Sequence, residues 1–244
     1  MKRYGLIGYP LTHSFSQRYF TEKFEREGIT GCSYANYSLP SIGELAGLLR
    51  DPELCGLNVT IPYKQQVIPY LDARDEVVAA IGACNCIKIV EGRLSGYNTD
   101  VVGFERSLVR RLEGHHRRAL VLGSGGAAKA VEWVLGRLGI SWLTVSRRPR
   151  PGSGSIGYED VDAGLLAEHT LVINTTPLGM YPHSDECPPL PYEAMTSRHY
   201  LFDLIYNPAK TLFLQKGEAR GATVENGLEM LVLQAEESWR IWNE

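Results

Sequence analysis

The sequence lacks long apolar segments, has few cysteines and carries almost no charge imbalance. No apolar run approaches the ~18 residues that a membrane-spanning helix needs, and residues 1–14 contain no signal-peptide core followed by a cleavage site. The five cysteines are scattered and odd in number, which argues against a disulfide framework and favours a reducing cytoplasm. With 25 Lys and Arg against 28 Asp and Glu, the net charge is −3. This argues against broad nucleic-acid binding, which needs a cationic surface.

Metal-site signatures are also missing. The six histidines have no ligand spacing, and Cys84 and Cys86 lie two residues apart without a second pair, so no tetrahedral zinc site is predicted. In a strand these two cysteines would face the same side, and we expect both to be buried as small hydrophobic residues. The remaining composition, 44% hydrophobic and 22% charged over 244 residues, is typical of a globular protein with one large or two small domains.

Short apolar runs alternate with helical patterns along the whole chain, which predicts a parallel sheet with helices on both faces. The first part contains predicted strands at 3–8, 32–39 and 56–61, helices at 14–28 and 41–50, and a hairpin of 83–90 with 93–98 around Glu91-Gly92. The second part contains predicted strands at 117–123, 141–147, 170–176, 199–206 and 222–226, and helices at 102–114, 126–139, 209–221 and 227–242. The prediction is an α/β fold with two lobes, divided near residues 100–103, with a ligand in the cleft between them.

Glycines 123, 125 and 126 directly follow a predicted strand and directly precede a predicted helix. This is the context of a dinucleotide-binding loop, in which glycine permits a tight turn and close approach of the pyrophosphate to the helix N-terminus. The end of the next strand, residues 146–150, reads Ser-Arg-Arg-Pro-Arg. An NAD site requires a carboxylate there, whereas arginine binds a 2′-phosphate, so the sequence favours NADP. The alternative is a plain tight turn followed by a solvated basic loop.

Polar motifs follow several of the predicted strands, where site residues belong in open α/β sheets. In chain order the motifs are GLNVTIPYK (56–64), GACN (82–85), GYNTD (96–100), LGSGGAA (122–128), INTTPLGM (173–180), DLIYNPAKT (203–211) and GLEMLVLQ (227–234). Together they resemble the shikimate dehydrogenase family, whose members reduce 3-dehydroshikimate with NADPH in aromatic amino-acid biosynthesis. The resemblance runs from residue 5 to about residue 240.

The resemblance implies Lys64 and Asp100 as the catalytic pair. A ketone that receives a hydride also needs a proton, and the reverse reaction needs a base, while the nicotinamide supplies the hydride. The implied substrate contacts are Ser14 and Ser16 with the carboxylate, and Thr60, Asn85, Tyr206 and Gln234 elsewhere on the substrate. The implied NADP contacts are Gly123, Ser124, Gly125, Gly126, Ala127, Ser146, Arg147, Arg148, Thr175, Leu204 and Gly227. Thr176, Pro177 and Glu76 are further positions near the cofactor.

The resemblance also implies the domain organisation. Residues 1–103 plus 228–244 would form the substrate-binding domain, because Gln234 brings the closing helix back to the first lobe, and residues 104–227 would form a Rossmann-type NADP-binding domain. Gly103 and Gly227 look like hinge positions, so we expect the lobes to close over the cofactor. The expected partner is a small-molecule substrate, with no nucleic acid, membrane or metal, in a cytoplasmic monomer or homodimer.

Three motifs depart from the family pattern, and several alternatives remain. The family's S-x-S-P motif is Ser-Phe-Ser-Gln at 14–17, its GAVNT motif is Gly-Ala-Cys-Asn-Cys at 82–86, and its N-R-T motif is Ser-Arg-Arg at 146–148. The first two leave open a broader quinate/shikimate dehydrogenase. A non-catalytic sensor of shikimate or quinate is disfavoured by the intact Lys64 and Asp100. The Y-x-x-x-K pattern at 206–210 is typical of short-chain dehydrogenases, but Pro208 disfavours the helix on which that pattern lies.

Overall fold

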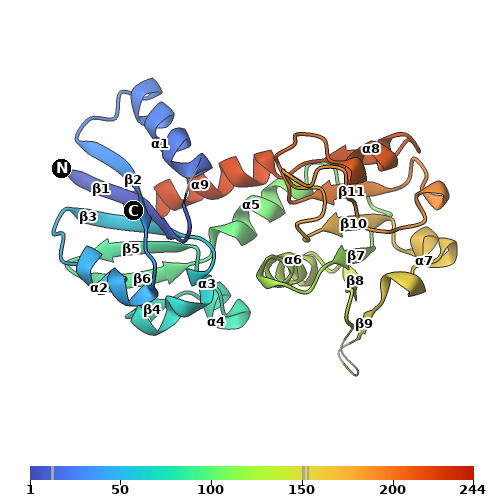
Figure 1. Cartoon of the computed structure of the whole chain (residues 1–244), viewed down its shortest axis with the longest axis horizontal. Coiled ribbons are helices and arrows are strands. Elements are labelled where there is room, and N and C mark those ends of the chain that lie inside the picture. The colour runs from blue at the N-terminus through green and yellow to red at the C-terminus, as the bar shows by residue number, and fades with distance from the viewer. Residues whose placement is uncertain (12–13, 150–151, 153) are drawn as a thin grey trace. The chain divides into compact units, whose positions relative to one another are not determined.

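The computed structural model describes residues 1–11, 14–149, 152 and 154–244. The chain divides into two compact units, one formed by residues 1–99 with 235–244 and the other by residues 100–234. Each unit contains one six-stranded sheet (Figure 1). The two ends of the chain therefore belong to the same unit.

The sheet of the first unit is mixed. Its order is β2-β1-β3-β5-β6-β4, and β1 is parallel to both β2 and β3, whereas β5 is antiparallel to β3 and β6. The predicted hairpin is confirmed: Glu91 and Gly92, with φ of 50° and 77°, make its two-residue turn between the antiparallel strands β5 and β6. The strands are β1 (Lys2–Gly8), β2 (Cys32–Ser38), β3 (Leu54–Val59), β4 (Ala73–Arg74), β5 (Cys86–Val90) and β6 (Arg93–Tyr97).

Helix α1 (Phe15–Arg26) follows its predicted limits closely. It begins because the Ser14 hydroxyl accepts a hydrogen bond from the Gln17 N–H at 3.3 Å, and the chain leaves the helix at Gly28, which has a φ of 62° that glycine adopts readily. The predicted helix at 41–50 is instead a 3-10 turn (Ile42–Glu44) followed by the short helix α2 (Leu45–Leu48). Two further helices, α3 (Tyr63–Gln66) and α4 (Glu76–Ile81), were not predicted.

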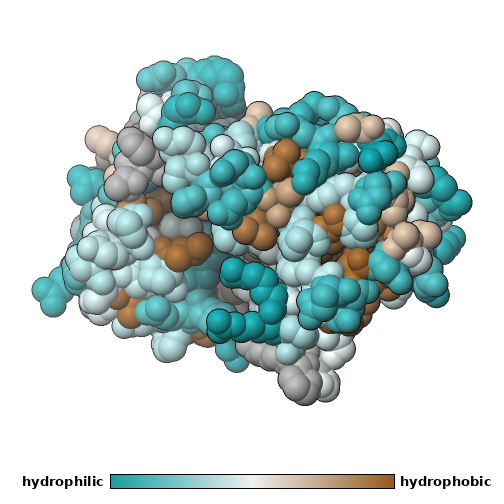
Figure 2. Space-filling model, turned by 45° about the vertical axis from the view of Figure 1, so that its right-hand side comes forward, coloured by the Kyte–Doolittle hydropathy of each residue, from teal (hydrophilic) through white to brown (hydrophobic). Residues whose placement is uncertain are grey.

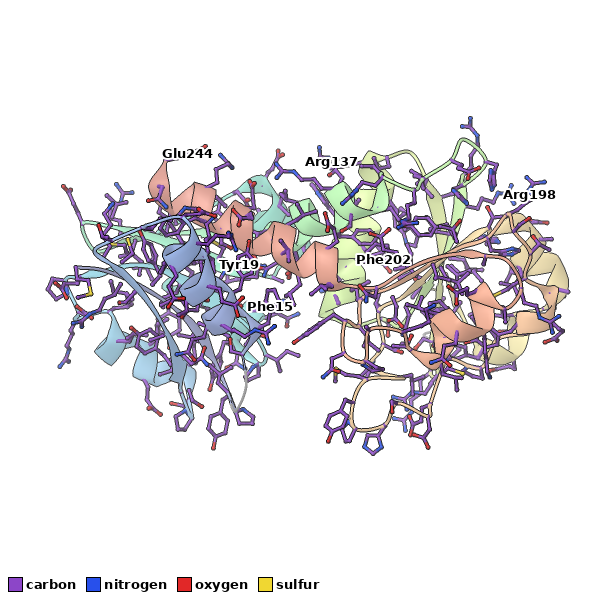
Figure 3. The ribbon with its side chains drawn as sticks, turned by 90° about the horizontal axis from the view of Figure 1, so that it is seen from above. Phe15, Tyr19, Arg137, Arg198, Phe202 and Glu244 are labelled. Atoms are coloured by element: carbon purple, nitrogen blue, oxygen red, sulfur yellow. The ribbon has the colours of Figure 1, made fainter. Side chains whose placement is uncertain are left out.

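The last residues of helix α9 (Leu228–Asn243) pack onto the sheet of the first unit. Trp242 stacks on Tyr4 with ring centroids 4.8 Å apart and donates from Nε1 to the carbonyl of Ile87 at 2.9 Å. A Cβ at Gly56 would lie 2.3 Å from that Nε1, so glycine makes room for the indole. On the same helix, Glu236 accepts from the hydroxyl of Tyr19 on α1 (Figure 3).

Both Cys84 and Cys86 are fully buried, as predicted. They belong to different core clusters, however, so the expectation that they face the same side is wrong. The reason is that the ladder with β3 begins at Cys86. Cys84 precedes the strand and does not follow its alternation.

The sheet of the second unit is entirely parallel, as predicted, with the order β12-β11-β10-β7-β8-β9. The chain leaves β7 toward β8 on one side and later returns to β10 on the other, so a topological switch point lies at the carboxyl ends of β7 and β10. The strands are β7 (Arg118–Leu122), β8 (Ser141–Val145), β9 (Ser155–Ile156), β10 (Leu171–Asn174), β11 (Tyr200–Asp203) and β12 (Thr223–Glu225). The helices are α5 (Thr99–Leu108), α6 (Gly126–Arg137), α7 (Ala163–Glu168) and α8 (Leu212–Glu218), of which α7, like strand β9, was not predicted.

The structure gives Gly103 and Gly227 a packing role. A Cβ at Gly103 in α5 would lie 2.5 Å from the carbonyl oxygen of Met230 in α9. A Cβ at Gly227 would lie 2.1 Å from the carbonyl oxygen of Leu204. These close approaches require glycine at both positions, and the hinge role of the two residues stays a prediction. Near the first of them, Phe104 meets Phe202 of β11 edge-to-face with centroids 5.1 Å apart (Figure 3).

Hydrophilic residues cover most of the face seen in Figure 2, with hydrophobic residues in small patches between them. Among the residues that the structure describes, none of the helices is both long and apolar enough to cross a membrane.

Candidate functional site

The glycine loop after β7 leaves the start of α6 open to a ligand. Gly123 has a φ of 108°, and a Cβ there would lie 2.7 Å from the Thr175 Oγ1. A Cβ at Gly125 or Gly126 would meet no described atom within 4 Å. Gly125 is the N-cap, and no described side chain accepts a hydrogen bond from the first N–H groups of α6. Such N–H groups, at the positive end of a helix dipole, bind phosphate.

A cavity of about 1120 Å³ lies beside this loop, at the carboxyl ends of β7, β8 and β10. It brings together seven of the predicted cofactor residues, and Thr176 and Pro177 also line it. The seven are Gly123, Ser124, Gly125, Ser146, Arg147, Arg148 and Thr175. Arg150, the third arginine of the basic segment, lies outside the described residues.

The chemistry of this cavity fits NADP. The glycine loop provides backbone N–H groups for a pyrophosphate, and Arg147 and Arg148 are exposed at the end of β8, where a 2′-phosphate would be bound. Ser146 is oriented by the Arg148 N–H, which donates to its Oγ at 3.3 Å. No carboxylate follows β8 in the described part of segment 146–149, so the requirement for an NAD-type acidic residue is not met there.

Several residues of the cavity wall were missed by the sequence reasoning. Met180 is the last residue of the INTTPLGM motif, and Tyr181, His183 and Glu186 follow it closely, so their nearness to that motif was the available signal. Tyr158 follows β9, and no sequence pattern pointed to it as a site residue, because β9 itself was not predicted. The Tyr158 hydroxyl is buried, and this burial raises its pKa.

The other predicted cofactor residues lie outside the lining of this cavity. Gly126 and Ala127 are the first residues of α6. Leu204 and Gly227 meet beyond the end of β11, where the Leu204 N–H donates to the Asn174 carbonyl at 3.0 Å. Glu76 is exposed in the first turn of α4, in the first unit.

In the first unit, predicted substrate residues lie at the carboxyl ends of the parallel neighbours β1 and β3. Thr60 follows β3, and its N–H donates to the Ile7 carbonyl of β1 at 2.9 Å. Lys64 lies in α3, and its carbonyl accepts from the Cys84 N–H at 2.7 Å. This bond fixes the segment containing Lys64 beside the segment containing Asn85.

Ser16 and Asn85 lie at the two ends of one buried polar network. The Ser16 side chain lies near the Tyr34 hydroxyl, which donates to the Asn58 Oδ1 at 2.9 Å. The Asn58 Nδ2 donates to the Ser238 Oγ at 2.8 Å. The buried members are Ser16, Tyr34, Asn58, Asn85, Thr99 and Ser238.

At its far end this network holds the start of α5. The Asn85 Nδ2 donates to the Thr99 Oγ1 at 3.0 Å, and the Thr99 N–H donates to the Asn85 Oδ1 at 2.6 Å. The Thr99 and Ser238 hydroxyls are 3.3 Å apart. Asp100 is the next residue, in the first turn of α5, so Asn85 fixes the backbone that presents this carboxylate.

The last two predicted substrate residues belong to the second unit. Tyr206 is exposed, and residues 206–210 form no helix, so the pattern typical of short-chain dehydrogenases lacks its helix. Gln234 is buried within α9, and its Nε2 donates to the Leu231 carbonyl at 2.9 Å.

Comparison with known proteins supplies the family. Residues 6–87 match the model of the shikimate dehydrogenase substrate binding domain. The chain is 36% identical to "Shikimate dehydrogenase (NADP(+))" of Caldicellulosiruptor saccharolyticus, over 99% of this chain and 92% of that protein. This chain belongs to the shikimate dehydrogenase family.

Solved structures of the family share the fold. The shikimate 5-dehydrogenase of Thermus thermophilus, in complex with NADP(H) and shikimate, is 32% identical and superposes with a TM-score of 0.87 over 99% of this chain and 93% of that one. The quinate dehydrogenase of Corynebacterium glutamicum, in complex with NAD, is 26% identical with a TM-score of 0.86 over 99% of this chain and 93% of that one. The fold is therefore shared by proteins named for different substrates and cofactors.

Proposed function

We propose that this protein is an NADP-dependent shikimate dehydrogenase, an oxidoreductase that reversibly reduces 3-dehydroshikimate to shikimate in aromatic amino-acid biosynthesis. The observation that carries the proposal is the cavity in which the glycine loop after β7 meets Arg147 and Arg148 after β8. The full-length similarity to a protein named shikimate dehydrogenase (NADP(+)) supports the same substrate and cofactor.

The cofactor would be held by residues of the second unit, and it supplies the hydride. Backbone N–H groups of residues 123–127 would bind the pyrophosphate, and Ser146, Arg147 and Arg148 would bind the 2′-phosphate. Thr175 would line the cofactor site, and Leu204 and Gly227 would lie near the nicotinamide. Residues 104–227 are accordingly proposed as the NADP-binding domain, and residues 1–103 with 228–244 as the substrate-binding domain.

Lys64 and Asp100 are proposed to handle the proton. When the ketone carbon accepts a hydride, its oxygen gains negative charge and must take a proton to become the hydroxyl of shikimate. A lysine ammonium has three N–H donors, so Lys64 can hydrogen-bond this oxygen and give it the proton. In the oxidative direction the neutral Lys64 amine takes the single proton of the hydroxyl being oxidised, and the negative charge of Asp100 favours the ammonium that forms.

The substrate is a hydroxylated ring carboxylate, and the proposed contacts provide matching polar groups. Ser14 and Ser16 would donate to the carboxylate. Because the Ser14 Oγ already accepts from the Gln17 N–H, its own hydrogen remains to be donated. The other proposed contacts are Thr60, Asn85, Tyr206 and Gln234.

We also propose a cytoplasmic location and a monomeric or homodimeric state. The five cysteines form no disulfides, which suits a reducing compartment. Light scattering of the purified protein distinguishes the two assembly states.

A broader quinate/shikimate dehydrogenase is the second candidate, and a specific observation favours it. The quinate dehydrogenase of C. glutamicum shares the fold over nearly the whole chain, and Gln17 and Cys86 replace family residues next to proposed substrate contacts. Selectivity for a hydroxylated ring can depend on single hydroxyl contacts.

The deciding experiment measures nicotinamide reduction with shikimate or quinate, each with NADP+ or NAD+. Rapid turnover with shikimate and NADP+ alone supports the first proposal. Comparable turnover with quinate or with NAD+ supports the broader enzyme. Saturable shikimate binding without any turnover refutes both and leaves a sensor.

A further inference from the structure

A second, smaller cavity adjoins the proposed cofactor site. Its volume is about 170 Å³, which is room for about five waters at the ~30 Å³ each occupies in the liquid. Four residues line both cavities, namely Ser124, Gly125, Ser146 and Arg148. A cofactor lying against the glycine loop and Ser146 therefore reaches the mouth of the small cavity.

The side chains of the small cavity suit a phosphate group. Lys129 and Arg148 contribute two positive charges, and hydroxyls come from Ser124 and Ser146. Its other polar residues are Thr144, Ser155 and Glu132. The Glu132 carboxylate is the one negative charge among the described lining residues, and its Oε1 accepts from the Thr144 hydroxyl at 2.8 Å.

The position of Lys129 is itself informative. It is the fourth residue of α6, where the positive end of the helix dipole disfavours a cation unless an anion is bound nearby. Its ammonium forms no ion pair within the described parts of the chain. A bound phosphate would offset both the dipole and the neighbouring Arg148 charge.

We propose that Lys129, together with Arg148, binds the 2′-phosphate of NADP in this small cavity and is a specificity-determining residue for NADP over NAD. The inference rests on the proposed function and adds to it a residue on α6 that no sequence motif indicated. Glu132 opposes the phosphate electrostatically, so Lys129 and Glu132 should act on cofactor choice in opposite directions.

The test compares 2′,5′-ADP with 5′-AMP, which differ only in the 2′-phosphate, by calorimetric titration of the intact protein. For Lys129→Gln we expect the Kd of 2′,5′-ADP to rise about tenfold, as for loss of one charge-assisted hydrogen bond, with the Kd of 5′-AMP changed less than about twofold. Glu132→Gln, which keeps an acceptor for Thr144, should lower the Kd of 2′,5′-ADP. Arg137→Gln, at the far end of α6, also removes one positive charge and should change neither dissociation constant.

The proposal is overturned if Lys129→Gln leaves both dissociation constants unchanged or raises both by the same factor. It is also overturned if Arg137→Gln has the same effect, because the cause would then be net charge. Steady-state kinetics gives a second readout, in which the KM for NADP+ should rise while kcat with shikimate is kept. A wild-type protein that binds 2′,5′-ADP tightly but does not oxidise shikimate would refute the proposed function, and the binding test of Lys129 would still be valid.

Discussion

Replacing Thr99 by valine removes a hydroxyl while nearly conserving the side-chain volume, and we expect it to destabilise the protein. Thr99 is 1% exposed, and its Oγ1 is the acceptor for the Asn85 Nδ2 at 3.0 Å. Valine leaves this buried amide hydrogen without its acceptor, and an unsatisfied buried polar group costs about 1–3 kcal/mol. At about 2–4 °C per kcal/mol for a protein of this size, a loss of about 2 kcal/mol lowers the Tm by about 4–8 °C.

The matched control is Thr99→Ser, which keeps the hydroxyl and loses one methyl group. Its expected cost is about 0.8 kcal/mol, so the serine variant should be the more stable of the two. Urea unfolding followed by circular dichroism measures both. Equal stability of the two variants, or a valine variant as stable as wild type, would show that the Asn85–Thr99 bonds do not hold the start of α5. Because Asp100 is the next residue, we also expect the valine variant to have a lower kcat than the serine variant.

Two further predictions concern the second unit. Burial raises the pKa of Asp203 to about 6, from an ordinary value of 3.8, so the folded protein holds this proton more tightly than the unfolded chain does. The stability linked to this proton is present below pH 3.8 and is lost as the pH rises through 6. The free energy of unfolding of Asp203→Asn, measured with urea, should therefore increase relative to that of wild type as the pH rises from 4.5 to 7.5. A difference between the two proteins that does not change with pH would contradict this. Gly103→Ala should cost about 1–3 kcal/mol by overpacking, because its Cβ would lie 2.5 Å from the Met230 carbonyl oxygen. Gly136→Ala, whose Cβ would approach described atoms no closer than 3.7 Å, should instead gain up to ~1 kcal/mol from helix propensity, and equal Tm values for the two alanine variants would refute the packing argument.

Much of the fold could be predicted from the sequence because the local signals agree with one another. The alternation of apolar runs with helical patterns predicted the parallel sheet of the second unit, and Glu91-Gly92 predicted the hairpin of the first. This hairpin reverses the direction of β6 relative to β5, so the sheet of the first unit is mixed. Strand β9 and helix α7 are too short to give a periodic pattern.

The candidate site, too, could be predicted only in part from the sequence. The glycine loop and Arg147 follow predicted strands directly, so their meeting in one cavity could be anticipated from parallel-sheet geometry. The partners of Asn85 could not, because the bonds to Thr99 join residues 14 apart whose side chains have no shared pattern. Lys129 was missed for the same reason, since only the packing of α6 against β8 places it beside Arg148.

The most direct test of the central claim is the effect of Lys64→Ala on shikimate oxidation at saturating NADP+ and shikimate. We expect kcat to fall by about 10²–10⁴-fold, the usual contribution of a general acid–base group, while the Kd of NADP+ stays within about twofold. Lys2→Ala, which removes an exposed lysine from the same unit, should retain wild-type kcat. A Lys64→Ala protein that is folded, binds NADP+ and turns over shikimate within tenfold of wild type would contradict the assignment of the proton transfer to Lys64.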